Sequence, residues 1–316
     1  MGIQYLNSFI KKSVTKEAIK KIKLNSLFGK IIVVDTSIYL YRFLADEALM
    51  ENMYIMLALF RYYNITPIFV FDGKAPIEKA KILEKRNCDK INAEKEYNLI
   101  KSNIEYFNIG EDNEELVERM QILKKKFIRI KRDDIIKVQQ LMDAFGVTYI
   151  EADQEADEIC AKFVIKKIAY ACLSEDMDLF VYGCSRVLRY LSLINETVVI
   201  YYLDQILHDV NIPFKEFKEI CVISGTDYNF SIDNRTNLYK TLKYYKLYKL
   251  NNDTNQDFYS WLDINSDYVE NIFKLYNIYN MFITDNIELN RFKIKTKKPD
   301  QNRIKELMEP EGFIFV

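Results

Sequence analysis

Two short apolar runs, each of which ends in an aspartate, constrain this sequence more than any other feature. Residues 31–35 read IIVVD, and residues 67–72 read PIFVFD. Apolar runs of this length, bounded by glycine or polar residues, are typical of buried strands. The segment between them, 37–63, has the pattern of a helix. A strand, a helix and a second strand in this order favour two parallel strands of one sheet.

Further apolar runs extend this pattern along the chain. VTYI (147–150) and IAYACL (168–173) have the character of buried strands, with a helix predicted to begin near Gln154 between them. RVLRYL and TVVIYY predict two more strands in a hairpin, and the chain from Leu203 onward is mostly helical in pattern. We therefore predict an α/β fold whose central sheet is mainly parallel and flanked by helices.

The composition argues against several kinds of chemistry. The chain has a single histidine, His208, which argues against a histidine-based catalytic triad and against a zinc site rich in histidine. Its five cysteines show no CxxC spacing, which indicates buried thiols in a reducing, intracellular compartment. No run approaches eighteen apolar residues, so we expect no membrane span. Any hydrolysis would then depend on carboxylates, lysine and metal ions.

Acidic residues recur where the predicted strands end and the helices begin. Taken singly, each fits a structural role as a helix cap, a first-turn acid or a turn residue. The set consists of Asp35, Asp72, Glu155, Asp157, Asp176, Asp178 and Asp227. Parallel strands bring their carboxyl ends to one edge of a sheet, where ligands bind. So many carboxylates at one edge would repel one another strongly unless cations neutralised them.

The cations that suit such a site are hard ones. Mg²⁺ and Mn²⁺ take oxygen ligands, and two such ions about 4 Å apart can activate water and stabilise the leaving oxygen of a phosphodiester. The chain has no GxxxxGK[ST] segment, which argues against a nucleotide-driven motor. The sequence therefore predicts a metal site suited to phosphodiester hydrolysis.

The segments that carry these acids follow one another in a characteristic order. They read MGIQYLNSFI, FGKIIVVDTSIYLYRFL, FVFDGKAPIEKAKILEKR, EADQEADEICA, SEDMDLFVYG and ISGTDYN. Over about residues 1–230 they resemble the flap endonuclease, or XPG-type, group of structure-specific 5′ nucleases. The one change among the acids is Asp157, which stands where the family has glutamate.

The resemblance implies a domain organisation. It implies a PIN-like 5′ nuclease core over residues 1–228 and a helical C-terminal region over residues 229–316. Residues 75–144 are polar and too long for a simple crossover, with a break in their helical pattern expected at Gly110. In the family this insertion, about 75–135 here, forms a helical arch or gateway.

The resemblance also implies a cofactor and two basic catalytic residues. It implies two Mg²⁺ ions held by the seven acids, for which Mn²⁺ should substitute. Lys79 and Arg86 match a basic pair that reaches the scissile phosphate from the gateway. Seven residues apart on one predicted helix, they would share a face. The alternative for this pair is an ordinary solvated helix face.

Five more residues are candidates for contact with nucleic acid. Gly2 matches an N-terminal segment near the active site, and Tyr41 matches an aromatic that stacks on a base, although a core-lining tyrosine is equally consistent. Arg129, Lys131 and Arg132 belong to a basic run in the arch and are candidate phosphate contacts. A second basic run lies between Arg291 and Lys298.

The sequence departs from the family after residue 227. The family continues into a helix–two-turn–helix with a glycine-rich hairpin and a K⁺ site, but Asn234 and Thr236 replace the glycines here. Gln301, Ile304 and Leu307 loosely mimic a sliding-clamp box. We interpret KKPDQNRIKELM instead as a terminal helix, and predict no clamp partner.

These observations predict a structure-specific 5′ flap endonuclease and 5′–3′ exonuclease. Its substrate would be branched or 5′-flap DNA in replication, repair or recombination, and we expect a monomer. Two alternatives stay open: an RNA-directed nuclease of the same fold that degrades mRNA, and a non-catalytic nucleic-acid scaffold. The nucleus and the cytoplasmic replication site of a DNA virus both remain open as compartments.

Overall fold

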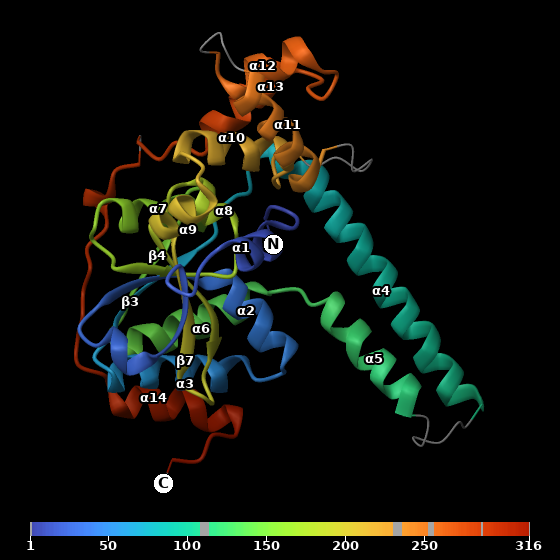
Figure 1. The fold of residues 1–316 in the computed structure, drawn as a ribbon. Coiled ribbons are helices and arrows are strands. Elements are labelled where there is room, and N and C mark those ends of the chain that lie inside the picture. The colour runs from blue at the N-terminus through green and yellow to red at the C-terminus, as the bar shows by residue number, and fades with distance from the viewer. Residues whose placement is uncertain (1, 108–113, 230–235, 252–255, 286, 316) are drawn as a thin grey trace.

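A seven-stranded sheet forms the centre of the molecule (Figure 1). The computed structural model describes residues 2–107, 114–229, 236–251, 256–285 and 287–315. The order of the strands is β1-β7-β6-β5-β2-β3-β4. Their bounds are β1 (Ile19–Lys23), β2 (Ile31–Asp35), β3 (Thr66–Phe71), β4 (Thr148–Glu151), β5 (Ala171–Leu173), β6 (Arg186–Ser192) and β7 (Thr197–Tyr202).

The sheet is mainly parallel, as predicted. Strands β2 to β6 pair in parallel, and β7 pairs antiparallel with both β6 and β1. The edge strand β1 was not predicted, because its sequence, IKKIK, contains no apolar run. It is held instead by its ladder with β7, in which Ile19 lies opposite Tyr201.

Helices cover both faces of the sheet, because alternate residues of each strand point to opposite faces. Val33 and Val70 point into one core and Val34 and Phe69 into the other. The first core is completed by α1 (Leu6–Ser13), α7 (Ala156–Ile165), α8 (Asp178–Val181), α9 (Leu203–Val210) and α10 (Phe214–Ser224). The second is completed by the 3-10 helix η1 (Leu24–Leu27), α2 (Thr36–Ala45), α3 (Leu49–Tyr62), α6 (Arg132–Phe145) and α14 (Gln301–Met308).

The predicted helix over 37–63 is in fact two helices, α2 and α3. The chain turns between them, and Glu47 has a left-handed φ of 55°. No glycine or proline marks this turn, so the sequence pattern predicted one continuous helix across it.

The predicted insertion is a pair of long helices that project from the body (Figure 1). A short 3-10 helix, η2 (Ile77–Lys79), leads into α4 (Ala80–Phe107), and α5 (Glu114–Lys126) returns toward the core. Gly110, the expected break, lies outside the described residues. Ion pairs link α5 to the turn between α2 and α3, from Lys124 to Glu47 and, at 3.8 Å, from Lys125 to Asp46.

The C-terminal region begins with three helices that pack near α10 (Figure 1). They are α11 (Leu238–Asn251), α12 (Phe258–Asn265) and α13 (Ile272–Met281), followed by the 3-10 helix η3 (Leu289–Arg291). Buried lysines fasten the chain after α13, because Lys162 donates to the carbonyl of Thr284 at 2.6 Å and Lys218 to that of Phe282 at 3.0 Å. Asn234, one of the residues that replace the expected hairpin glycines, lies outside the described residues.

The chain then returns along the edge strand β4. Thr148 Oγ1 accepts from the backbone N–H of Lys295 at 2.7 Å, and the N–H of Lys297 donates to the carbonyl of Gly146 at 2.9 Å. After Arg291, which ends η3, the rest of the second basic run, as far as Lys298, is therefore an extended strap. The predicted terminal helix begins at Gln301, and Asp300 caps it by accepting from the N–H of Arg303.

Of the side chains that loosely mimic a clamp box, Ile304 lies in the core, Leu307 packs partly against it and Gln301 is exposed. Ile304 is 1% exposed, since α14 packs on α6 within the second core. The last 3-10 helix, η4 (Glu309–Glu311), follows directly.

None of the helices in the described parts of the chain combines the length and the apolar character that a membrane crossing requires.

Candidate metal and nucleic-acid site

The fold brings the predicted acids to the carboxyl edge of the parallel strands. Asp35 is the last residue of β2, and Asp72 follows β3. Glu155 and Asp157 lie at the start of α7, which follows β4. Strand β2 lies between β3 and β5, so the chain winds in opposite directions on its two sides, and Asp35 occupies the point where α/β sheets place their ligands.

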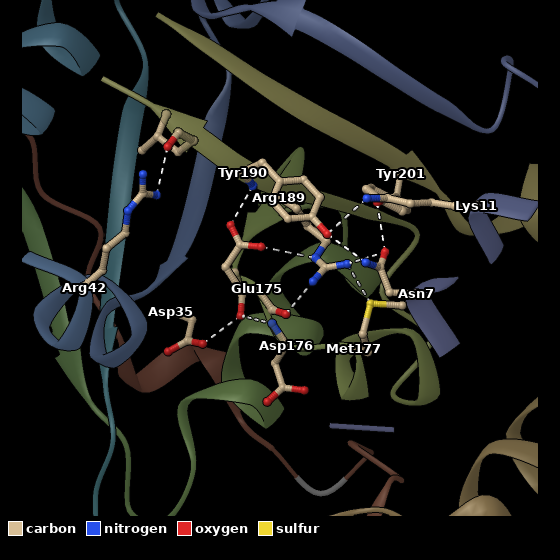
Figure 2. Close-up of polar contacts among 12 residues, drawn as sticks. Asn7, Lys11, Asp35, Arg42, Glu175, Asp176, Met177, Arg189, Tyr190 and Tyr201 are labelled. Atoms are coloured by element: carbon tan, nitrogen blue, oxygen red, sulfur yellow. Dashed lines mark hydrogen bonds and ion pairs between the residues drawn. The ribbon is translucent and has the colours of Figure 1, made fainter. Parts of the chain in front are cut away.

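A serine that the sequence reasoning missed ties the acids of two strands together. Ser174 Oγ donates to Asp35 Oδ2 at 2.7 Å and accepts from the N–H of Asp176 at 3.0 Å (Figure 2). The N–H of Asp178 donates to Asp176 Oδ1 at 2.9 Å. The loop after β5 thus orients Asp35, Asp176 and Asp178 together. The sequence signal for this role was weak, because a serine directly before EDMD is a common residue type in turns.

The carboxylates raise one another's pKa values. Burial, and then the charge of Asp72, raise the pKa of Asp35 well above its usual value. Burial and the charge of Asp176 do the same for Asp157 and for Asp178, and burial raises the pKa of Asp176. A site built this way is costly without a positive charge inside it.

Two carboxylate oxygens lack any protein partner. Asp157 Oδ1 and Asp178 Oδ1 are buried, and within the described chain neither accepts a hydrogen bond. Buried polar atoms are nearly always satisfied, so these oxygens fit the ligands of a hard cation. Among the described residues, no three such side chains converge closely enough to hold a metal ion by themselves. Mg²⁺ in proteins keeps several waters and commonly uses only one or two carboxylates.

The structural alternatives hold for several of these acids, since Asp157 and Asp178 lie in the first turns of α7 and α8. Asp35 and Glu155 occupy the positions before α2 and α7, but neither side chain makes a capping hydrogen bond. Asp72 does act as a cap, since its Oδ1 accepts from the N–H of Ala156 at 2.9 Å. The helix that it caps is α7 and not the one that follows it in sequence, and within the described chain no hydrogen bond to its Oδ2 is recorded.

The predicted basic pair faces the acids. Lys79 forms an ion pair with Glu155 and lies 3.8 Å from Asp227 Oδ2, while the guanidinium of Arg86 donates to the same Asp227 oxygen at 2.7 Å. Lys79 is the last residue of η2 and Arg86 belongs to α4. Burial lowers the pKa of Lys79, but the charges of Glu155, Asp157 and Asp227 outweigh it and raise that pKa above its usual value. Lys79 therefore stays charged.

Tyr228, also missed at the sequence level, braces this pair. Its hydroxyl donates to Glu155 Oε2 at 3.0 Å, and its ring lies 4.8 Å from Lys79 Nζ. Tyr182 is its second partner, at 3.1 Å between the hydroxyl oxygens. The only signal was its place beside Asp227 in TDYN.

Gly2 lies against the carboxylates. A Cβ atom at Gly2 would fall well inside van der Waals contact with Asp176 Oδ1 and Asp178 Oδ1, and its φ of 74° is one that glycine tolerates best. The backbone at Gly2 therefore approaches the acids more closely than any residue with a side chain could.

The remaining predicted contacts lie at the arch. Tyr41 is 43% exposed on α2, with Lys90 Nζ 4.8 Å from its ring centre, so the core-lining alternative is wrong. Arg129 is exposed and pairs with Glu94 of α4 at 3.2 Å. Lys131 and Arg132 are exposed where α6 begins. The structure records no contact between these three basic residues and the seven acids.

Two family models match the chain. The XPG N-terminal domain matches residues 1–93 and the XPG I-region matches residues 146–227, which together span more than half of the sequence. The segment between the two matches contains most of the arch.

Curated relatives and solved structures are similar over most of this chain. Flap endonuclease 1 of Methanococcus aeolicus is 25% identical, over 99% of this chain and 90% of the relative. Flap endonuclease 1 of Trypanosoma brucei brucei is 30% identical, but the match spans 68% of this chain and 57% of that protein. The catalytic core of Rad2 in complex with DNA substrate shares the fold, with a TM-score of 0.67 and 18% identity over 99% of this chain and 96% of that one.

Proposed function

This chain belongs to the XPG-type flap endonuclease family of structure-specific nucleases, and from that premise we propose that it cuts DNA at 5′ flaps with the aid of two Mg²⁺ ions. The observation that carries the proposal is the pair of buried oxygens on Asp157 and Asp178 that have no partner in the described chain. They belong to a group of acids beside two cationic side chains. A 5′–3′ exonuclease activity on the same substrates would use the same residues.

The seven acids would hold the metal ions, and Mn²⁺ should replace Mg²⁺ because both prefer oxygen ligands. The ions would supply positive charge that favours deprotonation of the attacking water and offsets the charge on the leaving oxygen. Asp35 and Asp176 would be oriented ligands, because Ser174 Oγ holds the carboxylate of Asp35 and the N–H of Asp178 holds that of Asp176.

Lys79 and Arg86 would orient the scissile phosphate. Lys79 now pairs with Glu155, and Arg86 pairs with Asp227. If a phosphate entered between the two cations, they would exchange these carboxylate partners for phosphate oxygens. Arg86 is the better placed of the two to move, since its side chain is 40% exposed and that of Lys79 is 9% exposed. Attack in line would release a 3′-hydroxyl and a 5′-phosphate.

The arch would select the substrate by shape rather than base sequence. A free 5′ strand would pass between the long helices and the core, with Tyr41 stacking on a base after Lys90 moves from its ring. Arg129, Lys131 and Arg132 would contact phosphates along this path. We further propose that the protein acts as a monomer on branched DNA, in replication, repair or recombination.

The test is cleavage of a 5′-labelled DNA flap, with Mg²⁺, with Mn²⁺ or with EDTA. Wild type is compared with Asp178→Asn and with Asp204→Asn, an exposed acid in the first turn of α9 that serves as the control. We expect both cations to support cutting, Asp178→Asn to abolish it and Asp204→Asn to leave it unchanged. A matched RNA flap that is cut faster than the DNA flap would redirect the proposal to RNA. Tight binding without any cation-dependent cutting would overturn it.

A further inference from the structure

A buried arginine contacts the loop that follows β5, residues 174–177, on the side away from the carboxylates. Arg189 of β6 is 5% exposed, and its guanidinium contacts three separate partners (Figure 2). Nη2 donates to the carbonyl of Glu175 at 2.9 Å, and Nη1 lies 2.9 Å from Met177 Sδ and donates to Asn7 Oδ1 at 2.8 Å. Nε lies 3.5 Å from Glu175 Oε2. One side chain thus joins β6, the loop after β5 and helix α1.

The neighbouring tyrosine strengthens the same connection. Tyr190 has a left-handed φ of 57° within an irregularity of the β6–β7 ladder, a conformation that is strained for an aromatic residue. This turn directs its N–H to Glu175 Oε1 at 2.6 Å, while its hydroxyl accepts from Asn7 Nδ2 at 2.8 Å. Tyr190 therefore contacts Glu175 and Asn7, two of the three residues that Arg189 also contacts.

The loop presents alternate residues to opposite sides. Glu175 and Met177 contact Arg189, whereas the side chain of Asp176 points away from it (Figure 2). The side chain of Asp178 lies near those of Asp176 and Asp227. Anything that fixes the first pair also fixes the direction of the second. Asn7 extends the restraint to α1, which begins four residues after Gly2.

We propose that Arg189 is a positioning residue that sets the metal affinity of the site without contacting the metal ions. It acts through Glu175 and Met177 on Asp176 and Asp178, and through Asn7 on the N-terminal segment at Gly2. This inference rests on the proposed function. Partners that orient metal ligands commonly change metal affinity by 10–100-fold when they are removed.

The proposal separates metal affinity from fold stability. Removing one partner of a buried ion pair can itself cost stability, so the melting temperature of every variant is measured beside its metal affinity. An apolar side chain of similar length fills the space of Arg189 but cannot donate to Glu175 or Asn7. The variant is Arg189→Met, with Arg189→Lys as the conservative form. The control is Arg186→Met, on the same strand, because Arg186 stacks on Tyr170 at 4.7 Å and has no recorded contact with residues 174–178.

Mn²⁺ binding is measured without DNA, from the electron paramagnetic resonance of the free ion, and the Mn²⁺ dependence of flap cleavage is measured in parallel. We expect Arg189→Met to weaken Mn²⁺ binding about 10-fold or more, Arg189→Lys to recover part of it, and Arg186→Met to match wild type. Cleavage by Arg189→Met should require more Mn²⁺ but approach the wild-type rate at saturation.

The outcomes distinguish this inference from the proposed function. Wild type that binds Mn²⁺ and cuts flaps, with an Arg189→Met variant of equal affinity, overturns the positioning role alone. Wild type that neither binds Mn²⁺ nor cuts overturns both. If Arg189→Met does not fold, the double variant Arg189→Met/Glu175→Gln removes the partner charge as well. Weak Mn²⁺ binding by that variant supports the inference, and wild-type affinity overturns it.

Discussion

Lys79 and Glu155 form an ion pair inside a group of carboxylates, and Tyr228 donates to the same glutamate oxygen. Lys79 has a second acid, Asp227, within 3.8 Å. The cation that would meet the phosphate is thus held by the acids around it, which keeps it charged and in place before DNA arrives.

Lys79→Met should lower the single-turnover cleavage rate by about 10²-fold, because it removes a buried cation aimed at the reacting phosphate. The affinity for flap DNA should change far less, since the proposed contacts of Arg129, Lys131 and Arg132 with phosphates would be unaffected. Lys81→Met, an exposed lysine at the start of α4, is the matched control and should cut at the wild-type rate. Equal rates for the two variants would contradict the role of Lys79.

Asp178→Asn should make the metal-free protein more stable while it removes metal binding. The raised pKa of Asp178 means that the folded state favours the neutral form, which asparagine imitates. In EDTA the melting temperature should exceed that of wild type by about 2 °C or more. Added Mg²⁺ should raise the melting temperature of wild type only. Lower stability in EDTA, with a normal Mg²⁺ response, would count against a metal ligand at this position.

Gly2→Ala should reduce cleavage by about 10²-fold, since a displacement of the ligands by even 1 Å is costly. The added Cβ would overlap Asp176 and Asp178. Gly29→Ala is a close control because Gly29 also has a left-handed φ, of 70°, but has open space around its Cβ position. Both variants carry the same kind of backbone strain, so only the overlap separates them. Comparable activity of the two, measured on one flap, would show that the close approach has no catalytic role.

Glu219 should make the protein less stable as the pH rises from 5 to 8. Burial raises its pKa from 4.5 to about 7, and its Oε2 has no hydrogen-bond partner in the described chain. Between these values the unfolded chain releases the proton while the folded protein keeps it, so the free energy of unfolding falls with rising pH. In Glu219→Gln the difference between the melting temperatures at pH 5 and pH 8 should shrink by about 2 °C or more. An unchanged difference would show that Glu219 does not carry this dependence.

The sequence predicted most of the sheet because its central strands are continuous apolar runs. Strands β2 to β7 all lie within the predicted segments or within a residue of them, and β5 is shorter than its segment, since it begins at Ala171. The edge strand β1 was not predicted because IKKIK has neither an apolar run nor a strict alternation of apolar and polar residues. The turn at Glu47 was not predicted because its sequence has no residue that breaks a helix.

The acids of the site were predicted for a related reason. Asp35 and Asp72 lie at the ends of strands, and Glu155, Asp157 and Asp178 lie at the starts of helices, so the parallel topology brings these five together. Asp176 lies in the loop after β5, and Asp227 follows helix α10. Ser174, Arg189 and Tyr228 could not be found in the same way, because common residue types gain a role only through tertiary contacts. Whether the seven acids bind metal stays a prediction for the experiments above.

The extended strap beside β4 has a consequence for how these molecules meet one another in solution. An open edge strand invites another chain to add to the sheet, but residues 293–298, with four lysines, run along one margin of this sheet. The opposite margin is β1, with three lysines in five residues. Like charges at both margins would repel a second copy, so self-assembly through strand addition is discouraged at each end of the sheet.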